Sequence, residues 1–106
     1  MIIRVFRAVV HPGKQHEFEQ FFMNKALPNV KAQSGLVSVM VGKPIDTSPT
    51  EFLMVTVWQD VNALKGFAGE HWQNPVIDPD EVHLLKETFV YHYESTHISL
   101  EEKYAK

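Results

Sequence analysis

The chain has 106 residues, of which 44% are hydrophobic and 22% are charged, and its formal net charge is −3. This length predicts a single domain, and the mildly acidic balance with scattered lysines excludes a basic nucleic-acid surface and a polybasic membrane patch. The absence of cysteine excludes disulfides and thiolate catalysis, and no apolar run approaches the roughly 20 residues that span a bilayer, so we expect a cytoplasmic protein.

The first half of the chain predicts a strand, a helix and a second strand. Residues 2–10 are β-branched and aromatic, and they end at a His-Pro-Gly turn. From Lys14 onward apolar residues recur at helical spacing, which predicts a helix that Gly35 closes. Pro28 should kink or loosen the last turns, because proline lacks an N–H and crowds the carbonyl four residues back. Residues 36–44 form the second predicted strand.

The second half predicts two more strands with a helix between them. Residues 51–58 form the third strand, and the polar loop that joins it to the second strand suggests a hairpin. Asp60 is a good N-cap for a second helix, which we expect to end near Gly69. A further helix is expected to begin with Asp78 as its cap, followed by a fourth strand over residues 88–94.

This order is β-α-β-β-α-β, which predicts an α+β, ferredoxin-like fold with a four-stranded antiparallel sheet. The domain is expected to span residues 1–94. Residues 95–106 are expected to form a C-terminal tail, with a capping-box pattern at residues 99–102 for a short helix that contacts a partner subunit.

All four predicted strands carry large apolar residues on both faces, although two helices can cover only one face of a sheet. Strict alternation in the second strand places Val37, Val39 and Val41 on one face and Leu36 and Met40 on the other. An apolar face left bare marks an interface, and the simplest cover is a second copy packed sheet against sheet. We therefore expect a homodimer.

Three short stretches and the order of elements give the chain a family resemblance. The stretches are "HPGK", "QSGLVSV" and "VTVWQDVNALKGF". Over residues 2–94 the chain resembles the antibiotic biosynthesis monooxygenase (ABM) domain. The resemblance implies a small protein of ferredoxin-like topology that pairs as a dimeric α/β barrel. Some members of that family oxidise phenolic or quinol substrates with neither metal nor flavin, and others bind and degrade heme.

The heme-degrading members use an Asn on the first strand, a Trp on the second helix and a heme-ligating His soon after it. The matching positions in this chain carry other residues, namely Arg4 or Arg7, Phe67 and Ile77. The resemblance therefore argues against heme degradation by that mechanism, and no cofactor is expected. Heme binding would need a ligand outside the family's pattern, such as His71 or His92.

Two histidines are candidate general bases, since histidine titrates near neutral pH and a deprotonated phenol is electron-rich enough for O2 to attack. His71 follows the second helix, and Trp72 beside it could supply one wall for a flat substrate. His92 shares a strand face with Glu94. The structural alternatives are a solvated His71 beside a surface aromatic and a cross-strand polar contact for His92.

The other site candidates surround the expected cavity between sheet and helices. The predicted substrate-binding residues are Asn62, Phe67, Trp72, Met40, Phe52, Tyr91 and Arg7. Arg4 and Arg7 lie on opposite faces of an apolar strand, where a charge must find a partner or reach the edge. Either could hold an anionic substrate or pair with Glu94, and core packing explains the apolar candidates equally well. The six histidines lack metal-ligand spacing, so no metal site is expected.

The first functional prediction is a cofactor-independent monooxygenase that acts on a small aromatic or quinol-like molecule in that cavity. One alternative is a non-catalytic homodimer that binds a small molecule or regulates through the same cavity. Another is a heme-binding ABM protein with a non-family ligand. No nucleic-acid or membrane partner is expected.

Overall fold

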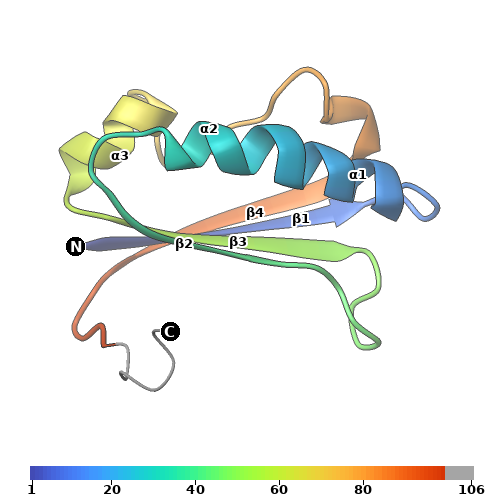
Figure 1. Cartoon of the computed structure of the whole chain (residues 1–106), viewed down its shortest axis with the longest axis horizontal. Coiled ribbons are helices and arrows are strands. Elements are labelled where there is room, and N and C mark those ends of the chain that lie inside the picture. The colour runs from blue at the N-terminus through green and yellow to red at the C-terminus, as the bar shows by residue number, and fades with distance from the viewer. Residues whose placement is uncertain (100–106) are drawn as a thin grey trace.

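A four-stranded antiparallel sheet carries the helices of the chain on one of its two faces (Figure 1). The computed structural model describes residues 1–99. The strands are β1 (Ile2–Val10), β2 (Leu36–Gly42), β3 (Glu51–Trp58) and β4 (Leu85–Glu94), in the spatial order β2-β3-β1-β4. The helical segments are α1 (Gln15–Phe21), the π-helix η1 (Phe22–Ala26), α2 (Leu27–Lys31), α3 (Val61–Ala68) and the 3-10 turn η2 (Val82–Leu84). The predicted α+β, ferredoxin-like fold is confirmed.

The first helical segment runs without a break from α1 through η1 to α2, but its middle is wound as a π-helix. This wider turn lies directly before Pro28, where the ring would crowd a regular helix. The predicted loosening near Pro28 is therefore confirmed. The segment ends before Gly35, whose φ of +81° favours glycine and whose missing Cβ would collide with the side chain of Ala63.

The core fills the space between the helices and the covered face of the sheet. Its largest fully buried side chains are Trp58, Phe18, Phe52, Leu64, Leu84 and Val10. The indole N–H of Trp58 donates to Thr56 Oγ1 at 2.8 Å, so this buried ring keeps its hydrogen bond. The same ring stacks on Phe67, with ring centroids 5.4 Å apart. This contact fixes α3 against β3.

The register of β2 shifts between Leu36 and Ser38, and this shift corrects one prediction. Strict alternation put Leu36 on the face opposite Val39, but Leu36 packs against the core together with Val39 and Val41. A bulge places one extra residue in a strand, so the residues on either side of it no longer alternate. Val37 is 44% exposed as a result.

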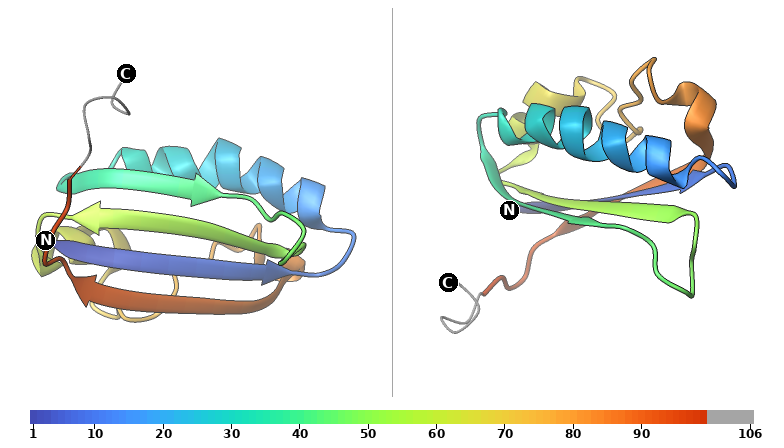
Figure 2. Two further views of the ribbon diagram at one scale, coloured as in Figure 1. Left: turned by 90° about the horizontal axis from the view of Figure 1, so that it is seen from below. Right: turned by 45° about the vertical axis from the view of Figure 1, so that its right-hand side comes forward.

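The other face of the sheet carries no helix, as the left view of Figure 2 shows. One row across this face consists of Met40, Val55, Val5 and Tyr91, which are partners in the strand register. A neighbouring row contains Ile3 and Tyr93. Met40 is 63% exposed and Tyr93 is 54% exposed. The prediction that the strands are apolar on both faces is confirmed.

Asp60 caps α3 as predicted, because its side chain accepts a hydrogen bond from the N–H of Ala63 at 2.8 Å. The helix ends at Gly69, which has a φ of +83°. Replacing Asp60 with Ala should lower the free energy of unfolding by about 1 kcal/mol, since one helix N–H loses its acceptor. Urea unfolding measures this loss. Asp46→Ala, at an exposed loop position, is the matched control, and an equal loss in both variants would contradict the capping role.

The segment after α3 differs from its prediction. The helix expected from Asp78 is only the short 3-10 turn η2, and β4 begins at Leu85, three residues earlier than predicted. Leu85 pairs with Val10 of β1, so the strand takes the residues that a helix would need. The predicted terminal helix at residues 99–102 lies outside the described residues, apart from Ser99. Within residues 1–99, no helix combines the length and apolar character needed to cross a membrane.

Candidate active site

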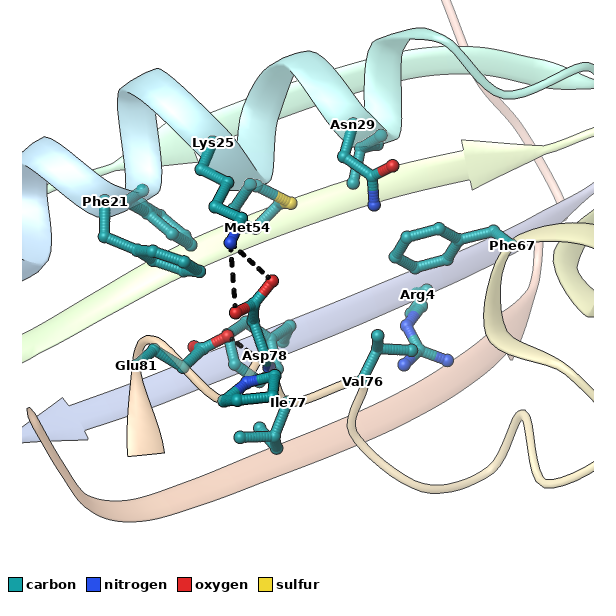
Figure 3. A pocket seen from close by; sticks show the side chains of 15 residues that line it. Arg4, Phe21, Lys25, Asn29, Met54, Phe67, Val76, Ile77, Asp78 and Glu81 are labelled. Carbon is teal, nitrogen blue, oxygen red and sulfur yellow. Dashed lines mark hydrogen bonds and ion pairs between the residues drawn. The ribbon is translucent and has the colours of Figure 1, made fainter. Parts of the chain in front are cut away.

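A cavity of about 570 Å³ lies between the helices and the covered face of the sheet (Figure 3). Its walls are mainly apolar, and they include Phe6, Phe21, Met54, Phe67, Val76 and Ile77. Five polar side chains also face it, namely Arg4, Lys25, Asn29, Asp78 and Glu81. Apolar walls, a few polar groups and a volume of this size are typical of sites for small molecules.

The π-helix supplies one wall of this cavity and a tether across it. Lys25 projects from η1, and its Nζ lies 3.2 Å from the carboxylate of Asp78 and 2.5 Å from that of Asp80. These ion pairs join the helix to the irregular segment 75–81, as Figure 3 shows for Asp78. Short π-helical turns are frequent at functional sites, because they change which side chains a helix presents.

Arg4 is a buried cation on the cavity wall, and it has no carboxylate partner within residues 1–99. Its Nη1 donates to the carbonyl of Trp72 at 2.6 Å and to His92 Nε2 at 3.0 Å, and its Nη2 donates to the carbonyl of Asn74 at 3.1 Å. Burial lowers the pKa of Arg4 to about 10, so the side chain stays charged at neutral pH. The site therefore holds a positive charge that only neutral acceptors partner in the described chain.

His92 holds Arg4 in place. A guanidinium can only donate, so His92 Nε2 accepts its hydrogen bond and Nδ1 carries the ring proton. Burial, together with the nearby charge of Arg4, lowers the pKa of His92 and favours the neutral ring. The indole of Trp72 packs against this ring edge-on, with centroids 4.9 Å apart. Because its accepting nitrogen is already occupied, His92 is better placed to orient Arg4 than to take a substrate proton.

Glu81 is the second buried charged group at the cavity. It is 4% exposed, and its Oε2 accepts a hydrogen bond from the backbone N–H of Asp78 at 2.9 Å. Burial raises the pKa of Glu81, and the hydrogen bond from Asp78 opposes this shift. Figure 3 shows Glu81 and Arg4 toward different ends of the cavity.

The structure separates most of the predicted substrate-binding residues. Phe67 lines the main cavity, whereas Phe52 lies in the core and lines a second cavity of about 220 Å³. Trp72 lies beside His92, and its carbonyl rather than its ring contacts Arg4. Asn62 is exposed on α3.

His71, Met40, Tyr91 and Arg7 lie away from the cavity. His71 is exposed on the turn that follows α3, and Met40 and Tyr91 belong to the bare face of the sheet. Arg7 binds Glu51 rather than Glu94, with its Nε and Nη2 at 2.9 and 3.0 Å from the two carboxylate oxygens. Arg7 also stacks over Phe89.

Sequence reasoning missed Glu81, Lys25, Asn29 and Asp78 as cavity residues. One signal pointed to the right place, because the positions compared with heme-degrading proteins included Arg4, Phe67 and Ile77. All three line the cavity. Within residues 1–99, no three His, Asp or Glu side chains are arranged to hold a metal ion.

A ferredoxin-like sheet with helices on one face, a cavity beneath them and a bare opposite face defines the fold class of this protein. A sequence model described as antibiotic biosynthesis monooxygenase matches residues 1–74. The chain belongs to this family. No curated protein matches it.

Solved structures share the fold at low sequence identity. A candidate antibiotic biosynthesis monooxygenase from Deinococcus radiodurans has a TM-score of 0.74 and 14% identity, over 95% of this chain and 98% of that one. A protein from Pseudomonas aeruginosa has a TM-score of 0.72 and 16% identity, over 91% and 94%. A mutant of MhuD, with two manganese protoporphyrin IX bound per active site, has a TM-score of 0.71 and 14% identity, over 95% and 100%. These similarities show that nearly the whole chain, and not only residues 1–74, has the same fold as these proteins.

Proposed function

We propose that the protein is a cofactor-independent monooxygenase that oxidises a small hydroxylated aromatic or quinol-like molecule in the main cavity. The observation that carries this proposal is Arg4, a buried cation on an apolar cavity wall with no carboxylate partner in the described chain. Such a charge stabilises an anion strongly, because little water is present to screen it. A phenol that loses its proton in this cavity becomes that anion.

The proposed reaction draws its electrons from the substrate. Deprotonation leaves an electron-rich ring, and this ring passes electrons to O2. One oxygen atom forms a new bond to a ring carbon, and the other leaves as water with the two hydrogens that the hydroxyl and that carbon give up. A hydroxyarene and one O2 thus become a quinone and one water.

A second copy of the chain is the partner that we propose for the bare face of the sheet. The row of Met40, Val55, Val5 and Tyr91 would be covered on both sides of such an interface. Burying large apolar side chains of this kind stabilises by about 1.5–3 kcal/mol each. Residues 95–99, which follow β4, leave the sheet on this side (Figure 1), so they would lie near the partner. The cavity lies on the covered face, so each copy would keep its own site.

A non-catalytic homodimer that binds a small molecule is the second candidate. It is favoured by the positions of the two predicted bases, since neither His71 nor His92 lines the cavity within the described residues.

Oxygen uptake by the purified protein with a panel of hydroquinones and naphthols separates these functions. A monooxygenase should consume one O2 per substrate, and ¹⁸O2 should label the product. Ligand binding without oxygen uptake would support the second candidate. The absence of both binding and uptake with all compounds would overturn both proposals. A heme titration that leaves the Soret band unshifted would exclude heme binding through His71 or His92.

A further inference from the structure

Glu81 is a carboxylate that the fold buries on the cavity wall without pairing it to a cation. Its Oε2 accepts the N–H of Asp78, while Oε1 has no hydrogen-bond partner within residues 1–99. No side-chain nitrogen or oxygen in that part of the chain is both fully buried and unpartnered, so Oε1 keeps some accessible surface. A buried carboxylate with one free oxygen on a cavity wall is a feature of acid–base sites.

The backbone around Glu81 fixes the direction of this carboxylate. The N–H of Glu81 donates to the carbonyl of Asp78 at 3.0 Å, and the carbonyl of Glu81 accepts from the N–H of Leu84 at 2.9 Å. The side chains at this turn are tied to its backbone, because Glu81 Oε2 accepts the N–H of Asp78 and the side chain of Asp78 accepts the N–H of Asp80. The free oxygen is therefore held in position before any substrate arrives.

Burial and the neighbouring charges together make the carboxylate of Glu81 a stronger base than an exposed glutamate. Burial raises its pKa above the ordinary glutamate value, and the negative charge of Asp78 raises it further. The hydrogen bond from Asp78 and the positive charge of Lys25 lower it. Arg4 lies toward the other end of the cavity (Figure 3). A carboxylate with a raised pKa is a stronger base than an exposed one.

We propose that Glu81 is the general base of the oxidation proposed above, and that the substrate places its reactive hydroxyl at Glu81 and a second oxygen at Arg4. The hydroxyl proton passes to Oε1 of Glu81, and its electron pair stays on the substrate oxygen. The ring then reacts with O2 as described above, and Glu81 returns its proton to the oxygen atom that leaves as water. This inference rests on the proposed function and names both its base and its substrate class.

The separation of the two groups sets the length of the substrate. Arg4 lies near the start of β1, whereas Glu81 lies close to the end, because Leu84 accepts the N–H of His11. The six residue-to-residue steps from Arg4 to Val10 span about 20 Å along the strand. The side chains of Arg4 and Glu81 extend into the cavity, so the gap that a ligand must bridge is shorter than this. This distance favours a fused-ring aromatic with an oxygen at each end over a single ring.

The free donors of Arg4 fit the second oxygen. Its Nε–H and one Nη2–H have no acceptor within the described chain. Arg7 uses the same two nitrogens to hold both oxygens of Glu51, so this side of a guanidinium can bind an oxyanion in two contacts.

Glu81→Gln tests the base, because the amide oxygen of glutamine can still accept the N–H of Asp78 but cannot take a proton. We expect kcat for a dihydroxynaphthalene, with its hydroxyls on different rings, to fall about 100-fold or more, with KM changed only a few-fold. In the wild-type protein kcat/KM should rise with pH through the raised pKa of Glu81 and then level off. This inflection should be absent from Glu81→Gln. Glu70→Gln is the matched control, since it makes the same change at an exposed carboxylate outside the cavity and should retain the wild-type profile.

Each outcome separates this proposal from the function on which it rests. A Glu81→Gln variant with wild-type kcat and an unchanged pH profile would overturn the role of Glu81 while leaving the oxidation established. If the variant does not fold, as judged by circular dichroism, the wild-type profile decides, and the lack of an inflection above the ordinary glutamate range would overturn the proposal. Equal kcat/KM for hydroquinone and the dihydroxynaphthalene would overturn the substrate class. No oxygen uptake with any compound would remove the oxidation and this inference together.

Discussion

Replacing Arg4 with methionine is expected to weaken the binding of hydroxylated aromatic anions about 100-fold and to abolish their oxidation. Methionine fits the apolar wall but leaves the cavity without its only buried cation in the described chain. Quenching of tryptophan fluorescence measures binding, and an oxygen electrode measures turnover. Arg4→Lys should have an intermediate effect, because lysine keeps the charge but lacks the planar fork.

Arg7→Met is the matched control for this prediction. Arg7 lies three residues along the same strand on the opposite face of the sheet, and it pairs with Glu51 at 2.9 Å. The structure predicts unchanged ligand affinity for this variant, because the side chains of Arg7 and Glu51 both lie away from the cavity. An equal loss of affinity in both variants would contradict the role of Arg4. It would favour the sequence-based assignment of Arg7 to substrate binding.

The substitution Val55→Asp is expected to convert the proposed dimer into a monomer. Val55 lies in the middle of the bare face, where its register partners are Val5 and Met40. In a dimer the new carboxylate would be buried opposite apolar side chains, at a cost of several kcal/mol. In a lone subunit the position is only half-buried, so the variant should still fold.

Sedimentation at micromolar concentration measures this change. The wild-type protein should sediment at twice the 12.2 kDa mass of one chain, and Val55→Asp at that mass. Val82→Asp makes the same substitution at an exposed position outside the sheet and should remain a dimer. A wild-type protein that sediments as a single chain would refute the proposed pairing. Ligand binding should survive in the monomer, because the cavity lies on the other face of the sheet.

The sequence predicted the parts of the fold that follow from periodicity and capping. Alternation and helical spacing located all four strands and both main helices, and Asp60 marked the start of α3. The bulge after Leu36 and the π-turn before Pro28 each involve a local change of register. Such changes depend on what the neighbouring strand or helix packs against, and a single sequence does not reveal this.

The candidate site was less predictable, because its polar groups come from segments without a regular period. Arg4 was recognisable as a charge in an apolar strand, and Phe67 as an aromatic residue of the second helix. Glu81 lies in the irregular segment, and its burial follows from a turn that packs against the end of β1. The sequence assigned His92 to the strand face of Glu94, but it did not reveal that its partner directly across the sheet is Arg4. The contact between His92 and Arg4 depends on the pairing of β1 with β4, which lie far apart in the chain.

Arg4 has two roles in this molecule, and a substitution that changes one of them also changes the other. The guanidinium that faces the cavity also fastens the carbonyls of Trp72 and Asn74, and so anchors the loop after α3. A chain that exchanged this side chain to accept a neutral compound would also release that loop. New ligand preferences in close relatives should therefore arise around the arginine, through the apolar residues that shape the cavity, while the arginine itself is retained.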